Sequence, residues 1–184
     1  MDNILFKNKY RIATARLRGW DYASVGYYFV TICTKWRHPW FGEINEGRIE
    51  MSGVGRIVML SWTQIPQHFP NVQLDEFVVM PDHVHGIVVI DNGQSVETLQ
   101  CNVSTGRTTT NVRMSKISPK SRSLSTIVRS FKSTCAYAIH KIYSQKDFAW
   151  QSRYYDRIIR NDDELNTIRQ YIRNNPKHEN VNDR

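Results

Sequence analysis

Two histidines lie one residue apart in an apolar run near the middle of the chain. The segment VVMPDHVHGIVVI, residues 78–90, places His83 and His85 in a stretch with the composition of a β-strand. Side chains at i and i+2 of a strand project from the same face, about 7 Å apart at the backbone, so the two imidazoles point together while Val84 and Gly86 point the other way. Imidazoles so placed can share one divalent ion, or they can form a hydrogen-bonded polar patch. The pair by itself leaves both interpretations open.

A second pair of polar residues lies near the C-terminus, in the segment IRQYIRNNP. Tyr171 and Asn175 are four residues apart and therefore share one face of a helix. If Leu165, Ile168 and Ile172 face the core, the pair lies along the flank of that stripe, between buried and open surface. A tyrosine in such a position normally packs with its hydroxyl in water, so the spacing alone does not indicate catalysis.

The elements that must position these residues follow from the apolar pattern and the turn residues. Strands are predicted at 27–34, 73–80, 83–90 and 154–160, a hairpin at 41–51 with its turn at 45–47, and helices at about 53–68, 123–145 and 161–175. Asn161 is expected to cap the last helix with Glu164 at the capping-box position, and Pro176 to end it near Asn175. The order of these elements predicts an α+β fold of the ferredoxin-like, split βαβ type. Such a fold has an antiparallel sheet with helices on one face, here with an extra C-terminal helix.

The composition is that of one folded domain with a basic surface. With 184 residues, 40% of them hydrophobic, we expect a single domain over residues 1–184. Residues 1–24 read as a basic N-terminal arm and residues 91–123 as a long mobile loop. The net charge of +8 favours a polyanionic partner. Three cysteines without a CxxC pair, and no apolar run of membrane length, argue against a disulfide framework, a structural zinc site and a membrane span, and suit a cytoplasmic protein.

Over nearly the whole chain, the sequence resembles the REP-associated tyrosine transposases, which are single-tyrosine members of the HUH nucleases. The resemblance runs through RLRGWDYASVGYYFVTICT, FGEI, DEFVVMPDHVHGIVVI, SFKS and AWQSRYYDRIIRNDDELNTIRQYIRNNP. It implies that His83, His85 and Asn175 bind a divalent metal, Mg²⁺ with Mn²⁺ as a substitute, and that Tyr171 is the nucleophile. The family often has Asn where Asp82 stands. The Asp82 carboxylate could add negative charge near the metal or cap the turn, and we favour the turn. Three other tyrosines are rival nucleophiles, although none has an amide four residues later: Tyr137, Tyr154 and Tyr155.

The resemblance also implies a reaction and a substrate. The protein is expected to cleave and rejoin single-stranded DNA beside a hairpin through a 5′-phosphotyrosine, as a monomer or homodimer in the bacterial cytoplasm, at the nucleoid. Candidate phosphate contacts are Lys7, Lys9, Arg11, Arg16, Arg18, Lys116, Lys120, Arg122, Arg129 and Lys132. Candidate base-stacking residues are Trp36, Trp40 and Trp150. About half of these charges are expected to be ordinary solvated surface, and tryptophans are more often part of a core.

Two other functions fit part of the same pattern. A non-enzymatic hairpin-binding module would use the basic segments as readily as a transposase does. A small metal hydrolase would use the two histidines without needing Tyr171. The three possible functions therefore differ in whether they need His83 as a metal ligand and Tyr171 as a nucleophile.

Overall fold

The structure is a computed structural model, and it describes residues 16, 17, 19–91 and 122–178. Most of the expected basic arm and nearly all of the expected loop at 91–123 therefore lie outside the described residues. Within the described ranges, no helix is both long enough and apolar enough to span a bilayer.

A four-stranded antiparallel sheet forms the centre of the fold. Its strands, in the order in which they lie side by side, are β4 (Val72–Val79), β5 (His83–Ile90), β1 (Gly26–Cys33) and β6 (Tyr155–Ile159). All three pairings are antiparallel. β1 and β5 are thus the inner strands, and both are rich in β-branched and aromatic residues that suit a sheet covered on two faces. The four strands predicted from the sequence are confirmed.

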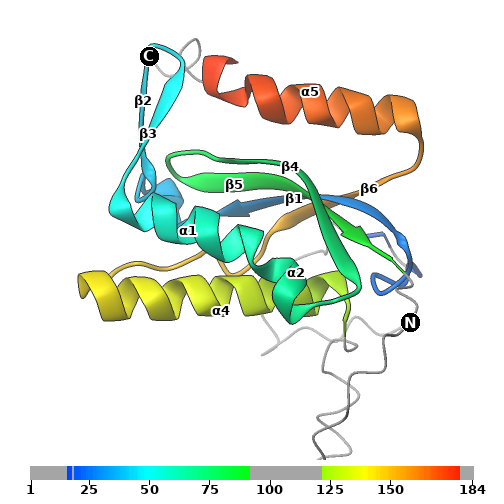
Figure 1. The fold of residues 1–184 in the computed structure, drawn as a ribbon, viewed down its shortest axis with the longest axis horizontal. Helices are drawn as coiled ribbons and strands as arrows, with labels where there is room; N and C mark the ends of the chain where they lie inside the picture. The colour runs from blue at the N-terminus through cyan, green and yellow to red at the C-terminus, as the bar shows by residue number, and fades with distance from the viewer. Residues whose placement is uncertain (1–15, 18, 92–121, 179–184) are drawn as a thin grey trace, which may run out of the picture.

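Helices cover both faces of this sheet (Figure 1). One face packs on α1 (Gly53–Thr63), α2 (Ile65–His68) and α4 (Leu124–Tyr143), and the other packs on α5 (Asp162–His178). The larger core lies on the first face. The smaller core, under α5, consists of Phe29, Ile87, Ile159, Leu165, Ile168 and Ile172. The ferredoxin-like α+β prediction is confirmed, and the extra helix covers the face that the other helices leave open.

Two helix boundaries differ from the prediction, both near prolines. The helix expected at 53–68 is divided at Gln64 into α1 and α2, and Pro66 occupies the first turn of α2, where its missing N–H costs little. The expectation that the last helix ends near Asn175 is wrong, because α5 continues through Pro176 to His178. Since Pro176 lies within the final turn, only one backbone hydrogen bond near the helix end is lost.

The start of α5 follows the sequence prediction. The Glu164 N–H donates to Asn161 Oδ1 at 2.8 Å, which satisfies one of the unpaired N–H groups of the first turn. The Glu164 carboxylate accepts from the Arg160 N–H at 3.0 Å instead of from the cap residue itself. The cap fixes where the helix begins and therefore which of its residues face the sheet.

The small hairpin of β2 (Gly42–Asn45) and β3 (Arg48–Met51) is also confirmed. Its turn residues Glu46 and Gly47 both have positive φ, as a two-residue hairpin turn requires. The hairpin stands beside the C-terminal end of α5 (Figure 1).

A glycine lets the histidine strand lie close to the main core. Gly86 is on the face of β5 opposite the histidines, and a Cβ added there would lie 2.3 Å from Cζ2 of Trp62. Trp62 is completely buried on α1. The sequence His-Val-His-Gly thus places two imidazoles on one face and an opening for a tryptophan ring on the other.

Candidate active site

The two histidines of β5 point together, as the strand period predicts. Nε2 of His83 and Nε2 of His85 are 3.0 Å apart, and both side chains are buried. Their other nitrogens are held from behind: Nδ1 of His83 lies 2.5 Å from Asp82 Oδ1, and Nδ1 of His85 lies 2.8 Å from Thr31 Oγ1. Thr31 is the direct neighbour of His85 in the adjacent strand. With both Nδ1 atoms engaged, the two Nε2 atoms are directed at one point.

The environment of His85 favours its neutral, metal-binding form. Burial, followed by the neighbouring His83 and Arg37, lowers the pKa of His85 to about 3. A carboxylate or hydroxyl that accepts the Nδ1 proton leaves the Nε2 lone pair free for a metal, which is the usual arrangement behind a ligating histidine. The 3.0 Å between the Nε2 atoms is well below twice a typical metal–nitrogen distance of about 2.1 Å, so both can ligate one ion. These residues therefore fit a divalent metal.

Tyr171 reaches the same point from the C-terminal helix. Its hydroxyl oxygen lies 3.3 Å from His85 Nε2, and its ring packs edge-on against the His85 ring at 5.3 Å between centroids. Phe29 of β1 stacks on His85 and meets the edge of Tyr171, which fixes both rings. The Tyr171 side chain is 47% exposed, so its hydroxyl is accessible to a large substrate.

Asn175 lies one turn beyond Tyr171 on α5 and is buried. Its amide makes no hydrogen bond to either histidine within the part of the chain that the structure describes. Over the same residues, no group of three or more His, Cys, Asp or Glu side chains is placed to hold a metal. A third protein ligand of another chemical type, such as an amide oxygen, would therefore be needed to complete a site with His83 and His85.

Two ion pairs, which were not predicted from the sequence, hold α5 on the sheet. Arg169 donates to both oxygens of Asp75, from Nε at 2.9 Å and from Nη2 at 2.5 Å, and Arg173 pairs with Glu76. Asp75 and Glu76 lie at an irregularity in the pairing of β4 with β5. A bulge redirects side chains at a sheet edge, and here it turns two adjacent carboxylates toward one helix. The spacing Arg-x-x-x-Arg on α5 was the available signal.

The expectation that Asp82 caps the turn is wrong. One oxygen of its carboxylate binds His83, and the other forms an ion pair with Arg37, with Nε at 2.6 Å. Arg37 also reaches Cys33, where its Nη1 lies 3.1 Å from Sγ. The carboxylate orients the His83 ring, and the guanidinium in turn holds the carboxylate in place.

The predicted phosphate contacts divide into three groups. Arg16 is tied into the fold, with Nε 3.0 Å from Asp156 Oδ1, and Lys132 donates to the carbonyl oxygens of Gln151 and Arg153 at 2.8 and 3.1 Å. Burial lowers the pKa of Lys132 to about 8. Two others, Arg122 and Arg129, are exposed. The remaining candidates lie outside the described residues: Lys7, Lys9, Arg11, Arg18, Lys116 and Lys120.

The aromatic candidates separate by burial. Trp150 packs in the core with Phe148, and Trp40 is partly buried against the same ring. Trp36, in contrast, is 85% exposed. The sequence carried a signal for this distinction, because Trp36 is flanked by Lys35 and Arg37, whereas Trp40 precedes Phe41 and Trp150 follows Ala149.

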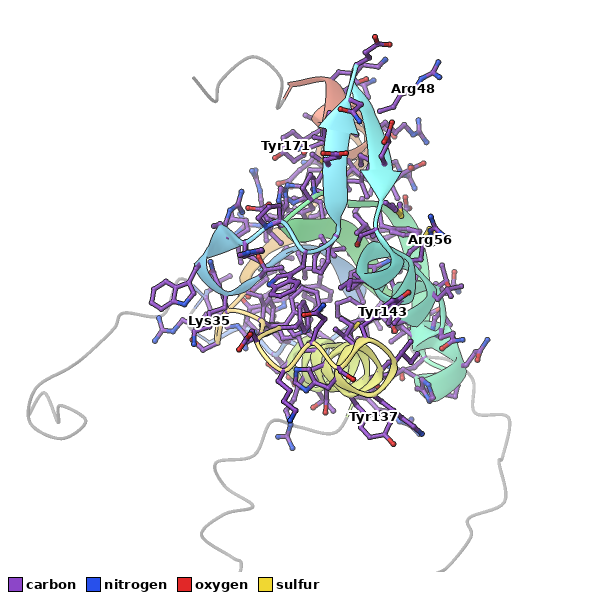
Figure 2. The ribbon with its side chains drawn as sticks, turned by 90° about the vertical axis from the view of Figure 1, so that its left-hand side faces the viewer. Lys35, Arg48, Arg56, Tyr137, Tyr143 and Tyr171 are labelled. Atoms are coloured by element: carbon purple, nitrogen blue, oxygen red, sulfur yellow. The ribbon has the colours of Figure 1, made fainter. Side chains whose placement is uncertain are left out.

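The rival tyrosines are less well placed than Tyr171. Tyr137 lies on α4, far from Tyr171 in the molecule (Figure 2). Tyr154 packs against the Arg16 guanidinium, and burial raises its pKa, which disfavours the nucleophilic phenolate. Tyr155 shares the sheet face of His85 and is half-exposed, with Thr31 between them in the sheet. It is therefore the most useful comparison residue.

Known proteins resemble this chain in sequence and in fold. Residues 112–175 match the family described as "Transposase IS200 like". An uncharacterized protein of Haemophilus influenzae is 36% identical over 165 residues, which are 88% of this chain and 86% of that protein. The solved structure of a REP-associated tyrosine transposase bound to a REP hairpin has the same fold, with a TM-score of 0.57 and 16% identity over 91% of this chain and 74% of that one. The chain therefore belongs to one family with the Haemophilus influenzae protein, and its C-terminal part, residues 112–175, matches the IS200-like transposases.

Proposed function

We propose that the protein is a metal-dependent strand transferase that cleaves and rejoins single-stranded DNA beside a hairpin, with Tyr171 as its nucleophile. The observation that carries this proposal is the 3.3 Å distance from the Tyr171 hydroxyl to Nε2 of His85. His85 is one of two buried histidines whose Nε2 atoms lie 3.0 Å apart. The family is one of transposases, and a protein of the same fold is bound to a REP hairpin. Both support DNA with a hairpin as the substrate class.

His83, His85 and Asn175 would hold the ion through two neutral imidazoles and an amide oxygen. A bound Mg²⁺ or Mn²⁺ offsets the negative charge of a phosphodiester and of its transition state. Mn²⁺ accepts nitrogen ligands more readily than Mg²⁺, so we expect it to support activity at least as well in vitro.

Tyr171 performs the covalent step. Its oxygen forms a bond to phosphorus as the bond from phosphorus to the 3′-oxygen breaks, the phenolic proton leaves, and the departing 3′-oxygen takes up a proton. The products are a 5′-phosphotyrosine and a free 3′-hydroxyl. Because a phenol is far more acidic than a sugar hydroxyl, the tyrosine is a good leaving group when another 3′-hydroxyl attacks, which permits joining as well as cutting.

The test is capture of the covalent adduct. Wild-type protein is mixed with a labelled DNA hairpin that carries single-stranded tails, with Mn²⁺, and the products are separated under denaturing conditions. Tyr171→Phe should form no adduct, whereas Tyr155→Phe, the matched control on the same sheet face, should form it. An adduct that persists in Tyr171→Phe would assign the nucleophile elsewhere.

The same assay separates the two other functions. His83→Ala, His85→Ala and Asn175→Ala should each lose the adduct while keeping hairpin binding. If no divalent metal supports cleavage and His83→Ala binds the hairpin as the wild type does, the protein is a binding module. Cleavage that survives in Tyr171→Phe without an adduct would indicate a metal hydrolase.

A further inference from the structure

Trp36 has the most exposed large hydrophobic side chain among the described residues. It is 85% exposed, and it lies in the 3-10 turn η1 (Lys35–Arg37), which follows β1 directly. An indole this exposed leaves its ring faces open to a flat aromatic partner, and its large apolar area would be buried on binding.

The backbone of this turn is unfavourable. Trp36 and Arg37 have φ angles of 61° and 56°, in the left-handed region that residues with bulky side chains rarely adopt. Surrounding contacts hold the turn in this conformation: the Lys35 N–H donates to the Ala149 carbonyl at 2.8 Å, and the Thr34 hydroxyl donates to the His38 carbonyl at the same distance. Residues kept in such conformations tend to cluster at functional sites.

The turn is connected to the histidine pair by side-chain contacts. Arg37, the residue after Trp36, forms an ion pair with Asp82, and Asp82 binds His83. Cys33, at the end of β1, is the direct neighbour of His83 in the sheet. The turn that carries Trp36 is therefore linked to a proposed metal ligand, His83, through Arg37 and Asp82 and through the neighbouring strand residue Cys33.

The charge around Trp36 suits a nucleic acid. Lys35 Nζ lies 5.6 Å from the centre of the indole ring, so a cation and an aromatic face are presented side by side. Single-stranded DNA offers one base and one phosphate per nucleotide, and exposed aromatic rings next to cations are the usual means of binding it.

We propose that Trp36 and Lys35 form a nucleobase-stacking subsite for the single strand on which Tyr171 acts. The inference rests on the proposed function for its substrate. One unpaired base stacks on the indole, and the adjacent phosphate pairs with Lys35. The subsite holds the strand in register with His83 and so contributes to the choice of the linkage that is cleaved.

The test is a binding experiment that does not require cleavage. Anisotropy of a labelled hairpin with single-stranded tails is measured in EDTA, with the full chain. A series of hairpins in which each tail nucleotide in turn is replaced by an abasic site is measured in parallel. Trp36→Ala should raise Kd about 5- to 150-fold, the usual range for one stacked base, and Trp36→Phe should restore most of the loss. At one tail position, the abasic site should weaken binding by the wild type but leave the affinity of Trp36→Ala unchanged.

The matched control is Tyr137→Ala. Tyr137 is 67% exposed, and Lys141 Nζ lies 5.6 Å from its ring, so it has the same pairing of cation and aromatic ring on α4. Figure 2 shows Tyr137 far from Tyr171, with Lys35 on a different side of the molecule. Tyr137→Ala should bind the hairpin as the wild type does.

Three results would overturn the subsite. Trp36→Ala could bind the hairpin as tightly as the wild type does. Alternatively, the loss of affinity of Trp36→Ala relative to the wild type could be the same for every hairpin in the abasic series. Sedimentation velocity of the free protein could also show that Trp36→Ala breaks an oligomer, which would assign the ring to a contact between two copies of the chain. Because binding is measured without a metal, these results are independent of whether the covalent adduct forms.

Discussion

The Tyr171 hydroxyl lies 3.3 Å from His85 Nε2, although 86 residues separate the two in the chain. The histidine belongs to an inner strand of the sheet, and the tyrosine belongs to a helix that packs on it through a small core and two ion pairs. The distance between them therefore depends on interactions of α5 with the sheet as well as on the two residues themselves.

The ion pair between Asp75 and Arg169 makes part of the stability depend on pH. The hydrogen-bonded Arg169 guanidinium lowers the pKa of the Asp75 carboxyl below its ordinary value of about 3.9. The stabilisation is complete above this ordinary value and is lost as the pH falls through the lower, folded value. Urea unfolding between about pH 5 and pH 3 should show a smaller loss of stability for Asp75→Asn than for the wild type. The exposed Asp147→Asn should keep the wild-type profile, and an unchanged profile in Asp75→Asn would contradict the prediction.

Replacement of Asp82 by Asn, the residue common in the resembled family, should weaken metal binding without unfolding the protein. The amide keeps a hydrogen-bond acceptor for His83 but loses the negative charge that strengthens the imidazole as a ligand and that pairs with Arg37. A loss of affinity of roughly 10-fold is expected for such a supporting group. Titration with Mn²⁺ followed by electron paramagnetic resonance measures it directly. An affinity equal to that of the wild type would show that the carboxylate has no part in the metal site.

Arg16→Ala should reduce stability more than it affects DNA binding. Asp156, its partner, is only 2% exposed in its side chain, and removal of the arginine leaves that carboxylate buried without its cation. Since the arginine is itself partly exposed, we expect a cost of about 1–3 kcal/mol in the free energy of unfolding. Chemical denaturation measures this, with the exposed Arg129→Ala as the control. A different outcome would contradict this prediction. If Arg16→Ala kept its stability, and the slope of hairpin affinity against salt concentration fell by about one phosphate contact, Arg16 would be a DNA contact as expected from the sequence.

Gly86→Ala should destabilise the fold because its new methyl group meets the Trp62 ring. The Cβ would lie 2.3 Å from Cζ2 of a fully buried tryptophan, so the ring or the strand has to move. Such overpacking costs about 1–3 kcal/mol. Unfolding of the double variant Gly86→Ala, Trp62→Phe should show a cost smaller than the sum of the two single changes, since the smaller ring makes room. Additive costs would indicate that the two residues are not in contact.

Local rules of the chain were sufficient to predict most of the fold. The period of two in strands placed His83 and His85 on one face, and the period near 3.6 in helices placed Tyr171 and Asn175 on one flank. The turn at Asn45–Gly47 and the cap at Asn161 were also predicted, because their chemistry is contained in a few adjacent residues.

Features that depend on register between distant segments could not be predicted. Thr31 supports His85 only because those two residues are opposite each other in β1 and β5, and composition does not fix that register. The bulge that turns Asp75 and Glu76 toward α5 breaks the alternation from which a strand is recognised. The role of Asp82 was misjudged for a related reason: its partner Arg37 is 45 residues earlier, on a turn whose conformation the sequence did not indicate.

The position of β5 between β4 and β1 determines how the site responds to partial opening of the protein. Backbone amides of an inner strand are shielded by hydrogen bonds on both edges, so they exchange with solvent deuterium only when much of the domain opens. The imidazole pair is thus expected among the slowest-exchanging residues, while the phenol is carried by α5, which packs on the sheet through the smaller of the two cores. Loss of reactivity on mild heating should therefore precede unfolding of the strand that carries His83 and His85.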